Sequence, residues 1–105
     1  MMRILLLGAD TVYRCGTLCN KAGTRELADA AADVSVPAIV ACEVLKLAPV
    51  DVPDAAGLSA DRDLTPAELI DRVFTEEGPF HPDELAALVD RTPFLRDGYA
   101  LLRRA

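Results

Sequence analysis

The chain has 105 residues, of which 51% are apolar, so it can form a packed core and is not a disordered chain. Its formal net charge of −6 excludes bulk nucleic-acid binding, because nothing would offset phosphate repulsion. No apolar stretch approaches the roughly 20 residues of a membrane span. The apolar run near the N-terminus is too short for a signal peptide. These features predict one domain over residues 1–105, in the cytoplasm and not bound to a membrane.

The first 42 residues predict one βαβ unit. Residues 2–7 are a continuous apolar run that ends at Gly8, which is typical of a buried parallel strand. Residues 24–34 have apolar residues at helical spacing, and Thr24 is the expected N-cap. Pro37 stops the helix, and residues 38–42 form a second apolar strand. The crossover between the two strands should be right-handed.

The second half predicts shorter elements. Residues 46–64 contain prolines, a glycine and several acids, and they are expected to form a surface loop. A short helix should follow over 66–71, capped by Thr65, then a third strand over 72–75. Further helices are expected over 81–91, with Pro82 near the first turn, and over 92–104, with Thr92 as a cap. The fold class is therefore α/β, part of a doubly wound parallel sheet with three or so strands and flanking helices. Such a sheet leaves a hydrophobic edge at its first strand, which predicts a homodimer or a complex with another chain.

The segment 8–24 between the first strand and the first helix carries the candidate site. Asp10 lies three residues after the strand ends, where ligands bind in open parallel sheets. Asn20 and Lys21 come just before the helix, whose N-terminus favours anions, and Gly23 would let the backbone approach a ligand closely. This combination suits a phosphorylated, hydroxylated small molecule. Lys21 and the helix end would hold phosphate, and Asp10 would move a proton or bind a hydroxyl.

Simpler interpretations remain open. Asp10 could be a loop or capping residue, and Lys21 a solvated surface charge. The glycines lack the spacing of dinucleotide and P-loop motifs. Glu76 and Glu77, after the third strand, could face the same site, but a polar turn before Pro79 is favoured.

The three cysteines predict no metal centre. An odd number of cysteines in a chain without a secretory signal indicates reduced thiols. Cys15 and Cys19 are four residues apart, and with Cys42 and His81 they would offer four zinc ligands. However, Cys42 belongs to a predicted strand, and His81 is expected to lead into a distant helix. Small buried thiols are therefore favoured, with no metal and no cofactor.

The segment from Leu5 to Leu47 resembles the core of the initiation factor 2B alpha/beta/delta family. That superfamily also contains methylthioribose-1-phosphate isomerase and ribose-1,5-bisphosphate isomerase. The later segment "DLTPAELIDRVFTEEG" resembles a second family motif, so the resemblance covers nearly the whole chain. The positions that match the first motif without gaps are Gly8, Ala9, Asp10, Gly16, Asn20, Lys21, Gly23 and Thr24.

The resemblance implies that residues 1–105 are the C-terminal portion of a Rossmann-like domain, and it implies roles for the matched residues. In the isomerase branch the aspartate of the motif is a catalytic acid/base, a role that carries over to Asp10. The Asn-Lys pair contacts the sugar phosphate, a role that carries over to Asn20 and Lys21, with Gly8 and Gly23 beside them. The isomerases also use a cysteine from a segment upstream of this motif, and that segment is expected to be missing from this chain. Cys15 and Cys19 should not be substituted for it.

Two functions follow from the resemblance, and a third interpretation is a structural remnant that binds no ligand. The first is an initiation factor 2B-like protein of the regulatory-subunit type, with a remnant site for a sugar phosphate or nucleotide phosphate. The second is a fragment or subunit of an aldose-ketose sugar-1-phosphate isomerase, of the ribose-1,5-bisphosphate or methylthioribose-1-phosphate type, with Asp10 as acid/base. On its own the chain is expected not to catalyse isomerisation. In both cases the expected partners are a phosphorylated small molecule and either a second copy or a related subunit.

Overall fold

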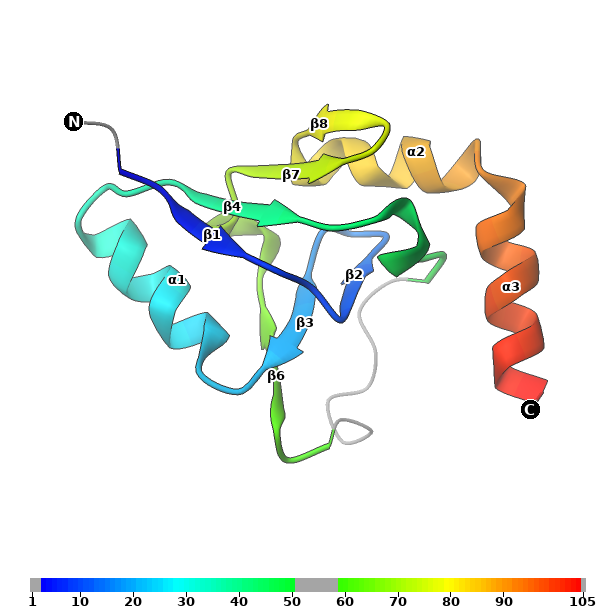
Figure 1. Ribbon diagram of the computed structural model, residues 1–105, viewed down its shortest axis with the longest axis horizontal. Helices are drawn as coiled ribbons and strands as arrows, with labels where there is room; N and C mark the ends of the chain where they lie inside the picture. Colours follow the sequence, from blue (N-terminus) through cyan, green and yellow to red (C-terminus); the bar gives the residue numbers. More distant parts are fainter. Residues whose placement is uncertain (1–2, 51–58, 105) are drawn as a thin grey trace.

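The computed structural model describes residues 3–50 and 59–104, and in them the strands form two sheets (Figure 1). The first sheet has the order β1-β4-β7-β8. Strands β1 (Leu5–Leu7), β4 (Ala38–Ala41) and β7 (Arg72–Thr75) run parallel, and β8 (Gly78–Phe80) returns antiparallel to β7. The three predicted strands are therefore present. Together with the flanking helices they confirm the α/β fold class.

The second sheet shows that residues 8–24 are not a simple loop, so that prediction is wrong. They contain β2 (Thr11–Tyr13) and β3 (Leu18–Lys21), an antiparallel hairpin. The hairpin is flanked by β5 (Leu47–Ala48) and β6 (Arg62–Thr65), in the order β5-β2-β3-β6. The expected surface loop over 46–64 thus contributes a strand at each end, and its residues 51–58 lie outside the described residues.

The other elements of the described residues are three α-helices and three short 3₁₀ turns. The α-helices are α1 (Thr24–Asp33), α2 (Leu85–Asp90) and α3 (Pro93–Arg104). The 3₁₀ turns are η1 (Val44–Lys46), η3 (Ala67–Leu69) and η4 (Pro82–Glu84). The short helix predicted after Pro66 is therefore only a 3₁₀ turn. In the described part of the chain, no helix is long and apolar enough to cross a bilayer.

The predicted helix caps are wrong in detail. The N-cap of α1 is Gly23, with φ of +100°, and the Thr24 hydroxyl instead donates to the Lys21 carbonyl oxygen at 2.7 Å. No side-chain hydrogen bond caps η3, so Thr65 does not act as its cap. The Thr92 hydroxyl donates backwards to the Leu88 carbonyl oxygen at 2.6 Å, at the end of α2. The hydroxyls of Thr24 and Thr92 thus bond to carbonyl groups earlier in the chain, which competes with capping, and the buried Thr65 hydroxyl has no hydrogen-bond partner among the described residues.

The hydrophobic core lies between the two sheets and α2. Alternate residues of the first sheet point inward, because successive side chains of a strand point to opposite faces. Side chains from the second sheet, α2 and the start of α3 meet them there. The buried core members are Leu7, Val12, Leu18, Val40, Val44, Leu47, Ile70, Val73, Leu85, Leu88, Val89 and Leu95.

The opposite side of the first sheet carries exposed apolar residues. Strand β1 lies at the edge of the sheet. Leu6 on this strand is 64% exposed, and Ile4 just before it is 53% exposed. The hydrophobic edge expected at the first strand is thus confirmed within the described residues. The principal extents of the molecule are 45 × 31 × 16 Å, so it is flat.

Candidate functional site

The polar residues of the 8–24 segment meet where β1 ends beside β3. The Asn20 side chain donates a hydrogen bond from Nδ2 to the Gly8 carbonyl oxygen at 3.1 Å, which ties the end of β1 to β3. The Asp10 N–H donates to the Cys19 carbonyl oxygen, also at 3.1 Å. Lys21 is the last residue of β3 and is exposed. The hairpin therefore brings Asp10 beside Cys19 and Asn20 beside Gly8, whereas Lys21 follows Asn20 in β3, so its side chain points to the other face of the second sheet.

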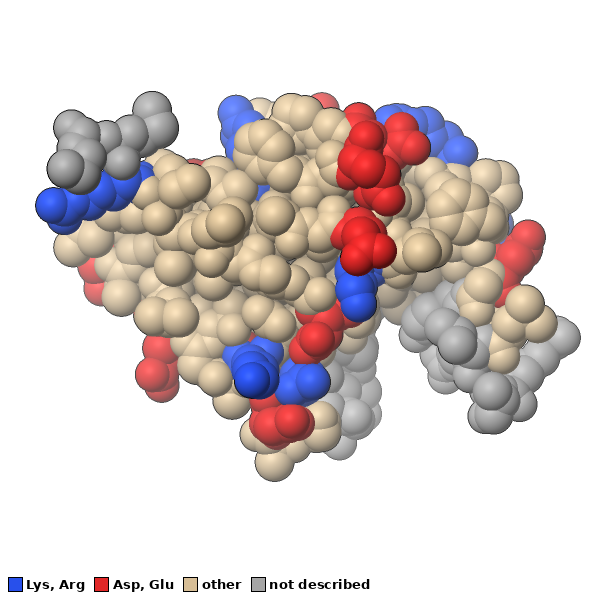
Figure 2. Space-filling model, in the orientation of Figure 1, with Lys and Arg blue, Asp and Glu red and all other residues tan. Residues whose placement is uncertain are grey.

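An arginine from β6 joins them. Arg62 lies directly opposite Lys21 in the β3–β6 pairing, and its Nε is 2.6 Å from Asp10 Oδ2. Its Nη1 is 3.0 Å from Asp61 Oδ2. A hydrogen bond from Ser59 and the charge of Arg62 lower the pKa of Asp61. We call the residues Asp10, Asn20, Lys21, Arg62 and Asp63 the Asp10 cluster; Figure 2 shows acidic and basic side chains close together in this region, at the lower centre of the view.

The start of α1 already has an anion bound to it, supplied by the chain itself. Asp63 of β6 accepts hydrogen bonds from two backbone N–H groups at the helix N-terminus, that of Gly23 at 2.9 Å and that of Arg25 at 3.3 Å. A carboxylate at this position satisfies unpaired donors and interacts favourably with the helix dipole. The helix end was expected to hold phosphate, and a phosphate would have to compete there with Asp63. The exposed Lys21 ammonium is therefore more accessible to a phosphate than the two N–H groups that are bonded to Asp63.

Replacing Asp63 with alanine is expected to lower the free energy of unfolding by about 1 to 2 kcal/mol, because two N–H groups lose their acceptor. Asp63→Asn keeps an acceptor oxygen without the charge and should lose about half as much. Asp61→Ala is the matched control, since Asp61 is exposed and its side chain interacts with Ser59 and Arg62 at the surface, and it should leave the stability close to that of the wild type. Urea denaturation measures all three. An Asp63→Ala protein as stable as the wild type would contradict the capping role.

The cysteines are not assembled into one site. Cys19 lies buried in β3, where burial and the negative charge of Asp10 raise the pKa of its thiol. Burial and the carboxylates of Glu76 and Glu43 raise the pKa of the Cys42 thiol to about 11. Cys15 is exposed, contrary to the expectation of three buried thiols, and lies 3.4 Å from the Thr17 hydroxyl oxygen. Within residues 3–50 and 59–104 no three His, Cys, Asp or Glu side chains are placed to hold a metal ion.

The other acidic pair and the histidine have structural roles. Glu76 and Glu77 form the turn between β7 and β8, and Glu76 Oε1 accepts from the Val44 N–H at 2.7 Å. His81 precedes η4, and its N–H donates to Glu84 Oε1 at 2.7 Å, as in a capping box. The polar turn and the helix lead-in were the favoured interpretations, and both are confirmed.

Sequence reasoning missed Arg62 and Asp63. Both lie in the stretch expected to be a surface loop, and each contacts a residue about 40 to 50 positions earlier in the chain. The segment "RDLT" has no regular alternation of polar and apolar residues, so it gives no clear local signal of a strand and does not identify the partner strand.

Comparisons with known proteins agree on one family. Residues 1–56 match the model of the Initiation factor 2 subunit family. The ribose 1,5-bisphosphate isomerase of Archaeoglobus fulgidus is 32% identical over 107 residues, which cover 81% of this chain and 34% of that protein. The structure of eIF2B beta from Chaetomium thermophilum matches with a TM-score of 0.79 and 30% identity, over 85% of this chain and 28% of that one. A 5-methylthioribose 1-phosphate isomerase from Pyrococcus horikoshii OT3, 18% identical with a TM-score of 0.69 over 86% of this chain and 33% of that one, shares the fold.

The fold and the Asp10 cluster define an α/β domain with a polar site where its first parallel strand ends. The chain belongs to the Initiation factor 2 subunit family, whose model matches more than half of it. It spans about a third of the length of the curated relatives that it matches. A tetrameric eIF2B complex is among the matching structures, with a TM-score of 0.77 and 29% identity, so structural relatives occur in multi-subunit assemblies.

Proposed function

We propose that this protein is an initiation factor 2B-like protein of the regulatory-subunit type that binds a sugar phosphate or nucleotide phosphate at the Asp10 cluster. The observation that carries the proposal is the Asp10–Arg62 ion pair beside Lys21, which lies directly opposite Arg62 in the β3–β6 pairing. The Lys21 ammonium is exposed, Asn20 is fixed to the end of β1, and the Asp10 side chain is 44% exposed beside Arg62.

The chemistry of these groups fits such a ligand. The Lys21 ammonium can donate hydrogen bonds to a phosphate, and these bonds are stronger than neutral ones because both groups are charged. A carboxylate accepts hydrogen bonds from sugar hydroxyls. Gly8 lies at the Asn20 contact, and Gly23 has no heavy atom near the place where a side chain would begin, so backbone at both positions can come close to a ligand.

The alternative is a part of an aldose-ketose sugar-1-phosphate isomerase. The observation that favours it is the identity to ribose 1,5-bisphosphate isomerases, 32% and 30% in two archaeal proteins. In that case Asp10 would move the proton between neighbouring sugar carbons, because it is the exposed carboxylate of the cluster. Cys19 does not supply the thiolate nucleophile, since its pKa is raised and it is buried.

Calorimetric titration with ribose 1,5-bisphosphate, methylthioribose 1-phosphate and AMP tests both proposals. We expect one of these ligands to bind, and Lys21→Ala to weaken that binding about tenfold or more, because a charge-assisted contact is lost. Lys46→Ala is the matched control: Lys46 is the other lysine of the chain, lies exposed at the end of η1 and should leave the affinity unchanged.

The same titration separates the two functions. In the isomerase alternative, Asp10→Asn should abolish turnover in the complete enzyme while leaving ligand affinity within about threefold. In the regulatory alternative, ligand binds without turnover in the complete assembly. If none of the three ligands binds to protein shown by circular dichroism to be folded, both ligand-binding proposals are wrong.

A further inference from the structure

The pairing of β3 with β6 places two cations side by side. Lys21 and Arg62 are directly opposite one another where this antiparallel pair ends. Residues that pair in this way have their side chains on the same face of the sheet, with Cβ atoms about 5 Å apart. Like charges so placed repel each other, and anions close to both of them relieve the repulsion.

Two carboxylates of the chain supply these anions. Asp10 Oδ2 is 2.6 Å from Arg62 Nε, and Asp61 Oδ2 is 3.0 Å from Arg62 Nη1. A hydrogen bond from Ser59 is the largest cause of the lowered pKa of Asp61, and the charges of Arg62 and Lys21 lower it further. The two positive and two negative side chains balance one another, so an incoming anion has to take the place of a carboxylate.

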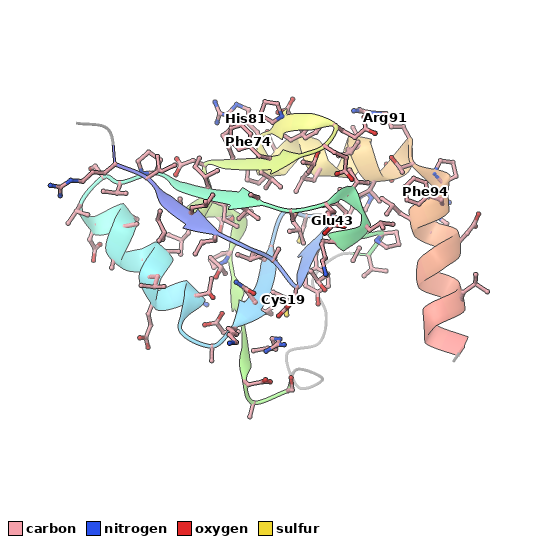
Figure 3. All side chains as sticks on the ribbon, in the orientation of Figure 1. Cys19, Glu43, Phe74, His81, Arg91 and Phe94 are labelled. Carbon is pink, nitrogen blue, oxygen red and sulfur yellow. The ribbon has the colours of Figure 1, made fainter. Side chains whose placement is uncertain are left out.

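The ion pair of Asp10 with Arg62 lies beside an apolar surface. Cys19 is on the same face of β3 as Lys21, and Figure 3 labels it at the lower centre of the view. Burial raises the pKa of the Cys19 thiol, the charge of Asp10 raises it further, and the charge of Arg62 lowers it, so both charges lie near the thiol. The Arg62 side chain is only 30% exposed. Contacts to this guanidinium are therefore stronger than those of a fully solvated one. The buried residues of the apolar surface are Tyr13, Cys19 and Ala48.

We propose that Arg62 binds the phosphate of the ligand and that Asp10 is its resting counter-ion, which the phosphate displaces; this rests on the proposed function, because the ligand and the cluster are the same. A phosphate dianion carries more charge than a carboxylate and matches the planar fork of a guanidinium, so it can replace Asp10. Lys21, directly opposite, binds the same phosphate from the neighbouring strand.

The displacement couples the arrival of a phosphate to the release of Asp10. While Asp10 is paired with Arg62, its Oδ2 atom is occupied and is a poor acceptor for a sugar hydroxyl. Once a phosphate has replaced it, the carboxylate is free to accept that hydroxyl. The site therefore selects phosphorylated over unphosphorylated sugars by two effects, the attraction of the cations and the release of the carboxylate.

Calorimetric titration with inorganic pyrophosphate isolates the phosphate contacts, because this probe has no sugar hydroxyl. Arg62→Ala should weaken its binding about tenfold or more. Arg62→Lys keeps the charge without the fork and should weaken binding about threefold, which stays measurable if the alanine variant does not fold. Arg72→Ala is the matched control: Arg72 lies in β7 of the other sheet, where it contacts His81, and should leave the affinity unchanged.

Removing the competing carboxylate should have the opposite effect. Asp10→Asn should tighten pyrophosphate binding about fivefold, whereas with ribose 1,5-bisphosphate the lost hydroxyl contact offsets this gain. In the Arg62→Ala background the same change should alter pyrophosphate affinity by less than about twofold, because Asp10 has no guanidinium left to compete for. An equal gain in both backgrounds would show that Asp10 merely repels the ligand by its charge, and would overturn the displacement.

The remaining outcomes distinguish this role of Arg62 from ligand binding itself. Suppose that Arg62→Ala and Arg62→Lys, shown by circular dichroism to be folded, bind pyrophosphate as tightly as the wild type while Lys21→Ala binds it more weakly. The ion pair is then structural, and the role of Arg62 is overturned while the ligand-binding proposal stands. If the folded wild-type chain binds neither pyrophosphate nor any of the three phosphorylated ligands, both proposals are wrong.

Discussion

Replacing Leu18 with alanine is expected to lower the free energy of unfolding by about 3 to 5 kcal/mol. Leu18 lies in β3, is 0% exposed and belongs to the core that joins the two sheets. Its neighbours are held by strand pairing on both sides, Val12 of β2 and Thr65 of β6, so the site can collapse little around the cavity. Chemical denaturation followed by circular dichroism measures the loss.

Two further variants keep this prediction testable. Leu18→Val removes less volume and should cost about 1 to 2 kcal/mol, which stays measurable if the alanine variant does not fold. Leu45→Ala is the control, because Leu45 is 69% exposed on η1 and should change stability by less than about 0.5 kcal/mol. Equal losses for Leu18→Ala and Leu45→Ala would show that Leu18 does not fill a tightly packed site.

Gly16→Ala is expected to lower the free energy of unfolding by about 2 to 4 kcal/mol, for two separate reasons. Gly16 turns the hairpin between β2 and β3 with φ of +94°, a conformation that strains a residue with a side chain. A Cβ atom there would also lie 2.8 Å from the Pro82 Cβ and 3.1 Å from the Ala67 Cβ. The hairpin turn is pressed against the segment before α2, so the glycine of the family motif has a structural role.

Gly78→Ala separates strain from crowding. Gly78 has φ of +115°, but no heavy atom lies within 4 Å of the place where its Cβ would stand. In this variant only backbone strain should lower the free energy of unfolding, by about 1 to 2 kcal/mol. Thermal and urea unfolding of both proteins give the comparison. If Gly16→Ala costs no more than Gly78→Ala, the contact with Pro82 adds nothing.

The parallel strands were predictable because their signals are local. Apolar runs closed by Gly8 or begun after Pro37 identify β1 and β4 from a few consecutive residues. The hairpin was not predicted, since β2 and β3 have only three and four residues and the segment was read as a connection between strand and helix. Strand β8 was missed as well, because it is three residues long and contains Pro79.

Some residues of the candidate site could also be predicted from local sequence, and others could not. Asp10, Asn20 and Lys21 lie within twelve consecutive residues, so one motif contains all three. Arg62 and Asp63 reach the site through the pairing of β6 with β3, and pairing between distant segments leaves no signal in a short stretch of sequence. The acid at the helix N-terminus could not be assigned for the same reason, because it comes from another strand and not from the residues that precede α1.

The order in which the strands enter the two sheets has a consequence for cooperativity. The first sheet takes β1, β4, β7 and β8, and the second takes β2, β3, β5 and β6. Any cut of the backbone between residues 21 and 62 therefore divides both sheets at once. Neither half of the chain contains a complete sheet that could persist alone. The two sheets should melt in a single transition, which calorimetry would show as equal calorimetric and van't Hoff enthalpies.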